Sequence, residues 1–219
     1  LPDTKLIITL RDPVDRAVSA YFHQVSHNFA PLAEVNKSLI NILNGQWADT
    51  YPRTSQIVKY GRYFKHIKKY VNYFDKKKFY ITTYKKITNK TYDITKSICE
   101  FLGVDPKKTP RVPHSKSNVG IYSQIRLRVA RLMNQIRFEY FHEGQRLRPK
   151  ESIGAFDRIT LRGLKVLNQH VLTFWEAGRP SLQPQVHDRL VRYYREDAEN
   201  LRSSFDLDVD HWSVFSNEK

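Results

Sequence analysis

The stretch that decides the fold is Lys5-Leu6-Ile7-Ile8-Thr9-Leu10-Arg11-Asp12-Pro13-Val14-Asp15-Arg16-Ala17-Val18-Ser19-Ala20-Tyr21-Phe22-His23. Its first part, from Lys5 to Leu10, is short, bounded and rich in isoleucine, which is typical of a buried parallel strand. Asp12 and Pro13 then supply a helix N-cap and a proline at the first helical position. The stretch therefore predicts a strand, a tight turn and a helix from Pro13 to about Ser26.

Arg11 and Ser19 are the two side chains in this stretch that point to a function. Arg11 follows the strand directly, and open α/β sheets bind ligands at the carboxyl ends of their strands. Ser19 lies six positions after Pro13, roughly 9 Å along the helix at about 1.5 Å per residue. A guanidinium and a hydroxyl placed in this way fit one phosphate group beside the helix. The alternative is an ordinary turn with Arg11 solvated and Ser19 packed.

The same stretch resembles the 3′-phosphate-binding segment of sulfotransferases that use 3′-phosphoadenosine 5′-phosphosulfate (PAPS). The wording Leu10-Arg11-Asp12-Pro13-Val14-Asp15-Arg16-Ala17-Val18-Ser19 is close to the carbohydrate, heparan-sulfate and bacterial branches of that family. The resemblance implies that Arg11 and Ser19 bind the 3′-phosphate. It also implies PAPS as co-substrate and a transfer that requires no metal.

The composition indicates a globular chain with a strong affinity for anions. Of 219 residues, 40% are hydrophobic and 27% charged, and no run of about 18 apolar residues encodes a membrane span. Cys99 is the only cysteine, so an internal disulfide and a cysteine-based zinc site are excluded, and we expect a cytoplasmic location. The formal charge of +15 favours a polyanionic partner such as a nucleic acid, an anionic glycan or a phosphonucleotide. Alternatively, most of the lysines only line solvated faces.

The order of the elements favours an α/β fold. Helical patterns are expected from Pro31 to Gly45, from Thr54 to Phe74 as one long amphipathic helix, and from Thr91 to Leu102. Phe79 to Tyr84 is expected to be a second strand, parallel to the first. We expect a P-loop-type parallel sheet flanked by helices, and a mostly helical C-terminal half.

The C-terminal half contains three expected helices, at about Tyr122 to His142, Asp157 to Asn168 and Pro184 to Ser203. A loop from Asp105 to Asn118 precedes them, and its Pro113 to Asn118 segment has basic and hydroxyl side chains suited to a phosphate or an acidic acceptor. We expect a single sulfotransferase-like domain over residues 1–219, with an α/β part over 1–103 and a helical part over 119–212.

Further segments extend the resemblance beyond the first helix. They are Gly61-Arg62-Tyr63, Tyr73-Phe74-Asp75, Tyr84-Lys85, Phe101-Leu102-Gly103 and the C-terminal Asp208 to Trp212. In cytosolic members a tyrosine matching Tyr84 lies against the adenine, so the resemblance implies the same role here. Lys85 stands where the family usually has glutamate. The alternative for Tyr84 is a core position in the strand.

The sequence lacks the residues that would bind the 5′-phosphosulfate group, which the reaction implied by the resemblance requires. In the family, a loop with lysine and serine or threonine grips the 5′-phosphosulfate, and it lies upstream of the arginine–serine segment. No Gly-rich loop of that kind occurs in this sequence, so we expect the piece to lack its first β-loop-α unit and to be inactive alone.

His23 is the candidate for acid–base catalysis. It lies one helical turn beyond Ser19, and imidazole has a pKa suited to proton transfer near neutrality. The alternative is a surface or packed histidine without a catalytic role. The transfer that the resemblance implies requires no metal, and we expect no metal site among the eight histidines.

Three functions compete on this reading. The leading one is a sulfotransferase that acts on a hydroxyl or amino group of a carbohydrate, such as an anionic glycan, or of a small molecule. The others are a basic nucleic-acid-binding protein, which explains the charge but not the strand–Arg–Ser order, and a relative of the P-loop nucleotide kinases. We expect no specific nucleic-acid partner.

Overall fold

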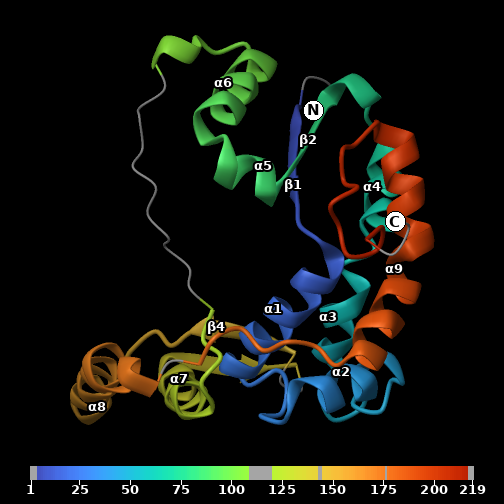
Figure 1. The fold of residues 1–219 in the computed structure, drawn as a ribbon. Helices are drawn as coiled ribbons and strands as arrows, with labels where there is room; N and C mark the ends of the chain where they lie inside the picture. The colour runs from blue at the N-terminus through green and yellow to red at the C-terminus, as the bar shows by residue number, and fades with distance from the viewer. Residues whose placement is uncertain (1–3, 109–119, 143–144, 176, 217–219) are drawn as a thin grey trace. The chain divides into compact units, whose positions relative to one another are not determined.

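The computed structural model describes residues 4–108, 120–142, 145–175 and 177–216. The chain forms two compact units, and each is assembled from separate segments (Figure 1). The first unit comprises Leu1–Arg16, Tyr60–Ser117 and Arg189–Lys219, and the second comprises Ala17–Lys59 and Asn118–Asp188. Each unit thus draws on both parts of the sequence, and the expectation of a single domain with parts at 1–103 and 119–212 stays a prediction.

The sheet of the first unit is a parallel pair of strands. β1 (Leu6–Leu10) pairs with β2 (Phe79–Thr83) in a register that joins Leu6 to Phe79 and Leu10 to Thr83 (Figure 1). The predicted parallel pairing is therefore confirmed, and the carboxyl ends of both strands meet at the same edge.

The second strand ends one residue earlier than expected. The Thr83 side chain accepts a hydrogen bond from the backbone N–H of Lys86, so Thr83 is the N-cap of a short helix, α5 (Tyr84–Asn89). Tyr84 is consequently the first residue of a helix and not the last of a strand. The next helix, α6 (Thr91–Leu102), has the predicted bounds and ends at Gly103 with φ of 80°.

The single long helix expected over Thr54 to Phe74 is wrong. Two helices, α3 (Ser55–Lys59) and α4 (Tyr63–Val71), are separated by the turn at Gly61. A Cβ atom at Gly61 would lie 2.7 Å from the ring of Tyr194, so only glycine lets the chain pass this ring. The Asp197 carboxylate accepts hydrogen bonds from the backbone N–H groups of Phe64 and Lys65, at 2.9 and 3.0 Å, and thereby caps α4.

Asp197 belongs to the long C-terminal helix α9 (Pro184–Phe205), which was predicted from Pro184 to Ser203. From Arg189 onward this helix supplies the core of the first unit. The buried side chains here include Leu190, Tyr194, Leu201, Val209 and Trp212, all with 1% or less of their surface exposed. Single turns of 3₁₀ helix at Lys76–Lys78 and Pro106–Lys108 complete this unit.

The second unit is mostly helical and includes α1 (Pro13–Ser26) from Ala17 onward. The bounds of α1 match the prediction. The remaining elements are α2 (Val35–Leu43), a 3₁₀ turn at Pro52–Thr54, α3, α7 (Gln124–Arg137), β3 (Phe138–Phe141), β4 (Arg146–Pro149), α8 (Ala155–Val166) and two helical turns at Leu167–Val171 and Leu172–Trp175.

The helix expected from Tyr122 to His142 is too long, because α7 ends at Arg137. Phe138 is already extended, and residues 138–141 pair with β4 in an antiparallel hairpin. Tyr140 from this hairpin packs on Phe29 with ring centroids 5.9 Å apart, and its hydroxyl accepts a hydrogen bond from Asn28. Aromatic residues favour a strand where such partners exist, and these contacts outweigh the helical pattern. Among the described residues, no helix is long and apolar enough to cross a membrane.

Candidate functional site

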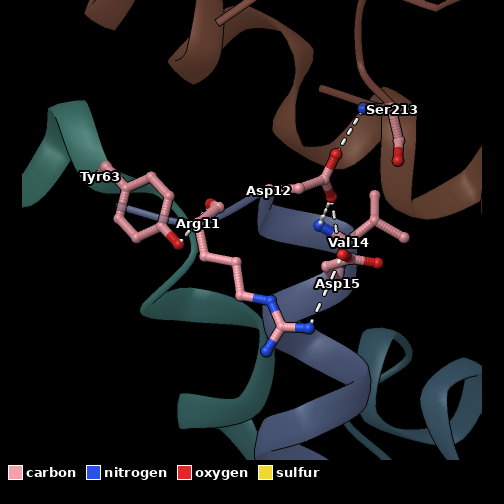
Figure 2. Close-up of polar contacts among 6 residues, drawn as sticks. All are labelled: Arg11, Asp12, Val14, Asp15, Tyr63 and Ser213. Carbon is pink, nitrogen blue, oxygen red and sulfur yellow. Dashed lines mark hydrogen bonds and ion pairs between the residues drawn. The ribbon is translucent and has the colours of Figure 1, made fainter. Parts of the chain in front are cut away.

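Arg11 is held through its backbone at the carboxyl end of β1. The hydroxyl of Tyr63 donates a hydrogen bond of 2.8 Å to the Arg11 carbonyl (Figure 2). The Arg11 side chain is 35% exposed, with its guanidinium 3.7 Å from the Asp15 carboxylate and 5.6 Å from the centre of the Tyr84 ring. The structure therefore brings Arg11 and Tyr84 close together.

Asp12 ties the same turn to the C-terminal segment. One carboxylate oxygen accepts hydrogen bonds from the N–H groups of Val14 and Asp15, at 2.8 and 2.9 Å, so Asp12 is the N-cap of α1. The other oxygen accepts a hydrogen bond from the N–H of Ser213 (Figure 2). This hydrogen bond holds the segment after α9 against the start of α1, next to Arg11.

These side chains line a pocket of about 350 Å³ in the first unit. Its lining residues come from the end of β1, the start of α5 and the C-terminal segment. They are Leu10, Arg11, Asp12, Asp15, Thr83, Tyr84, Lys85, Thr88, His211, Trp212 and Ser213. Tyr84 is 53% exposed, so its ring is accessible and it is not a core strand residue.

Two titratable groups beside the pocket have shifted pKa values. Burial raises the pKa of Tyr63 to about 12, against the opposing charge of Arg16, so Tyr63 keeps its proton and donates to Arg11 at neutral pH. Burial lowers the pKa of His211, and the positive charge of Lys85 lowers it further, against the opposing charge of Asp208. His211 is therefore neutral at pH 7 and offers both a donor and an acceptor nitrogen.

Ser19 and His23 line a different hollow, in the second unit. It measures about 410 Å³ and is bounded by Ser19, Phe22, His23, Ser26, Gly120, Ile121 and Tyr122. Loss of water around the ring lowers the pKa of His23, and repulsion by His27 and Arg53 adds to this effect. The ring of His27 lies 4.4 Å away between centroids. His23 is therefore an unprotonated base at neutral pH, although its side chain remains exposed.

Comparison with known proteins decides the family of this chain. The family model described as a sulfotransferase domain matches residues 1–152. The chain belongs to the sulfotransferase domain family. A curated relative, the bifunctional heparan sulfate N-deacetylase/N-sulfotransferase 4 of Mus musculus, is 32% identical over 108 residues, which are 48% of this chain and 12% of that protein.

This sulfotransferase-family chain also resembles a solved structure in its fold. The crystal structure of a sulfotransferase from Alicyclobacillus acidocaldarius matches with a TM-score of 0.56 at 18% identity, over 96% of this chain and 58% of that one. The predicted α/β sulfotransferase fold, with its small parallel sheet and helical C-terminal part, is confirmed. This chain spans 58% of the solved bacterial chain and 12% of the mouse protein.

The sulfotransferase family implies PAPS as co-substrate, and the pocket of the first unit contains residues of the kinds that such a molecule requires. A phosphonucleotide requires cationic donors for its phosphates and an open apolar face for its base. Arg11 and Lys85 provide the cations, and the exposed Tyr84 ring provides the face. Among the described residues, no group of three or more metal-ligating side chains occurs. The Pro113 to Asn118 segment lies outside the described residues.

The sequence did not single out His211 or Ser213 for this site, and Lys85 was noted only as a departure from the family pattern. The C-terminal residues form no motif with Arg11, because they reach the pocket through the Asp12–Ser213 contact across 201 residues of sequence. The one signal was the resemblance of Asp208 to Trp212 to the end of bacterial sulfotransferases.

Proposed function

We propose that the chain is part of a sulfotransferase that binds PAPS and transfers its sulfuryl group to a hydroxyl or amino group of a carbohydrate or small molecule, and that turnover requires a 5′-phosphosulfate-binding loop in addition to the residues described here. The observation that supports this best is the joint position of Arg11 and Tyr84, with 5.6 Å between the guanidinium and the ring centre, in a pocket at the carboxyl ends of two parallel strands. Membership of the sulfotransferase domain family supplies the reaction class.

In this proposal Arg11 binds the 3′-phosphate and Tyr84 lies against the adenine, while the phosphate-binding role of Ser19, which lines the hollow of the second unit, stays a prediction. The Arg11 guanidinium is 3.7 Å from Asp15, in an exposed i,i+4 pair that contributes little stability. A phosphate carries more charge and accepts two parallel hydrogen bonds from one guanidinium. Binding therefore exchanges the weak Asp15 contact for a stronger one to the ligand.

The acceptor proposed here is a carbohydrate, and in particular an anionic glycan. The curated relative is named for N-sulfotransfer on heparan sulfate, and the net charge of +15 attracts an acidic chain from a distance. PAPS supplies the sulfuryl group when bound. A ring nitrogen of His23 takes the proton of the acceptor hydroxyl or amine. The nucleic-acid and kinase alternatives lose their support, because the family match explains the strand–Arg–Ser order directly. A cytoplasmic location stays our prediction.

Calorimetry with adenosine 3′,5′-bisphosphate tests the nucleotide site. Arg11→Ala should weaken binding by about 1.5–3 kcal/mol, the range for a hydrogen bond to a charged group, which is about 10- to 150-fold in Kd. Arg192→Ala removes the same charge from an exposed position of α9 outside the pocket and serves as the matched control. If both variants lost the same affinity, the contribution of Arg11 would be only its general positive charge. That result would contradict its assignment to the phosphate site.

The pH dependence of turnover, measured on a form that also carries a 5′-phosphosulfate-binding loop, tests His23. Since its pKa is lowered, His23 loses its proton below the ordinary histidine value, so the acid limb of kcat/KM should lie below about pH 6.5. Activity falls on that limb because the protonated ring accepts no further proton. In His23→Gln the limb should disappear and kcat should fall about 10²- to 10⁴-fold, the usual contribution of general acid–base catalysis. An unchanged pH profile in the variant would remove His23 from the mechanism.

A further inference from the structure

Helix α8 and the turns that follow it carry a second apolar face, which the described residues leave exposed. The packed side of α8 is formed by Leu161 and Leu164, and Leu172 continues it. On another side, the exposed fractions are 80% for Phe156, 67% for Ile159, 57% for Val166, 85% for Phe174 and 57% for Trp175. Large apolar side chains exposed singly are ordinary, but a contiguous set marks an interaction surface.

The spacing makes this set one strip. Phe156, Ile159, Gly163 and Val166 follow one another at three- and four-residue intervals, so they share a face of α8. A Cβ atom at Gly163 would meet nothing within 4 Å, so the strip is also open at its middle. Beyond α8, the turns at Leu167–Val171 and Leu172–Trp175 end in two more exposed aromatic residues, Phe174 and Trp175. We name Phe156, Ile159, Gly163 and Val166, together with Phe174 and Trp175, the apolar strip; its part on α8 spans roughly 15 Å at about 1.5 Å per residue.

A row of positive charges runs beside the apolar strip. Arg158, Arg162 and Lys165 lie four and three residues apart and are all exposed. At 100° per residue this row occupies a sector of α8 between the apolar strip and the packed side. The helix therefore presents apolar and cationic surface side by side, with aromatic residues at both ends of the apolar strip.

We propose that the apolar strip and its basic row lie on the surface of an anionic lipid bilayer. Helices that bind in the plane of a membrane combine Phe, Trp and aliphatic residues on one side with Lys and Arg beside them. The apolar strip enters the boundary between headgroups and acyl chains, and the basic row contacts the lipid phosphates. The run holds three basic residues among twelve in α8, so it lies on the bilayer and does not cross it.

Charge favours lipid over a second copy of the chain as the occupant. An antiparallel pair of identical strips would bring the two basic rows to the same side, where like charges repel. Anionic headgroups instead supply the negative charge that the row lacks, and the net charge of +15 strengthens the attraction. This inference does not depend on the proposed sulfotransfer.

Co-sedimentation of the full chain with vesicles tests the proposal. The chain should pellet with vesicles of phosphatidylglycerol and phosphatidylcholine, and much less with phosphatidylcholine alone or at high salt. F156S/F174S should weaken binding at least about tenfold, the effect of losing one buried aromatic side chain. R158Q/R162Q should weaken it roughly fivefold for each charge removed. Tyr73→Ser, which removes an aromatic that is 84% exposed in the first unit, should bind like the parent.

All the substituted side chains are exposed, so thermal unfolding should be unchanged in each variant. Affinity for adenosine 3′,5′-bisphosphate should also be unchanged, which separates this test from that of the nucleotide site. Equal vesicle binding by F156S/F174S and the parent would overturn the proposal. So would a dimer in analytical ultracentrifugation that F156S/F174S abolishes without any vesicle binding by the parent, because the strip would then bind a second copy.

Discussion

Replacement of Trp212 by alanine should lower the free energy of unfolding by about 3–5 kcal/mol, the range for deletion of a large buried aromatic side chain. Trp212 is 1% exposed and its ring centroid lies 5.9 Å from that of Tyr63. Because Tyr63 donates to the Arg11 carbonyl and Trp212 lines the same pocket, the variant should also bind adenosine 3′,5′-bisphosphate more weakly. Urea unfolding followed by circular dichroism measures the first effect, and calorimetry measures the second.

Trp175→Ala is the matched control for this experiment. Its side chain is 57% exposed in the second unit, so the free energy of unfolding should change by no more than about 0.5 kcal/mol. Trp212→Phe keeps most of the apolar volume and should recover part of the stability and of the nucleotide affinity. If the two alanine variants unfolded at the same urea concentration, the C-terminal segment would not be packed as described.

Removal of the Asp197 carboxylate is the second change with a large expected effect. Asp197→Ala leaves the N–H groups of Phe64 and Lys65 without their acceptor at the start of α4. Both hydrogen bonds are only partly buried and Lys65 is exposed, so we expect the free energy of unfolding to fall by about 1–3 kcal/mol, the cost of one buried donor that loses its partner. Urea unfolding measures this loss.

Two further variants separate the cap from simple loss of charge. Asp197→Asn keeps one acceptor oxygen and should be less destabilised than Asp197→Ala. Asp208→Ala removes a carboxylate whose side chain is 69% exposed and whose ion pair with Lys86, at 3.3 Å, is worth about 0–1 kcal/mol. A loss in Asp208→Ala as large as that in Asp197→Ala would show that charge, and not the cap of α4, sets the stability.

The sequence predicted those elements that local residues determine. Asp12 and Pro13 define the start of α1, and Gly103 defines the end of α6, because capping and positive φ depend on one or two neighbouring side chains. The parallel pairing of β1 and β2 was also predictable, since apolar strands joined by helices pair in that way.

Elements that depend on distant residues escaped prediction. The apolar spacing from Thr54 to Phe74 runs through Gly61 without a break, and the break there reflects Tyr194 and the cap from Asp197, more than 130 residues away in sequence. The β3–β4 hairpin was missed for a similar reason, because Tyr140 finds its partners at Asn28 and Phe29.

In the candidate site, too, residues placed by local sequence were predictable and residues placed by distant contacts were not. Arg11 and Tyr84 were each predicted to bind the nucleotide, and they share a pocket because both follow the ends of parallel strands. His211 could not, because no periodicity links a residue after the last helix to the first strand. Its position depends on a single backbone N–H, that of Ser213, and on the buried ring of Trp212.

Because of the Asp12–Ser213 contact, the pocket can form during synthesis only after Ser213 has been added to the chain. The two residues are 201 positions apart, and chains grow at about 5–20 residues per second, so the end of β1 waits roughly 10–40 s for the segment that closes it. A nascent chain that stops just before Ser213 has both strands and all of α9, yet the pocket at the end of β1 lacks one wall. Ligand capture in this pocket would therefore report that translation has passed Ser213.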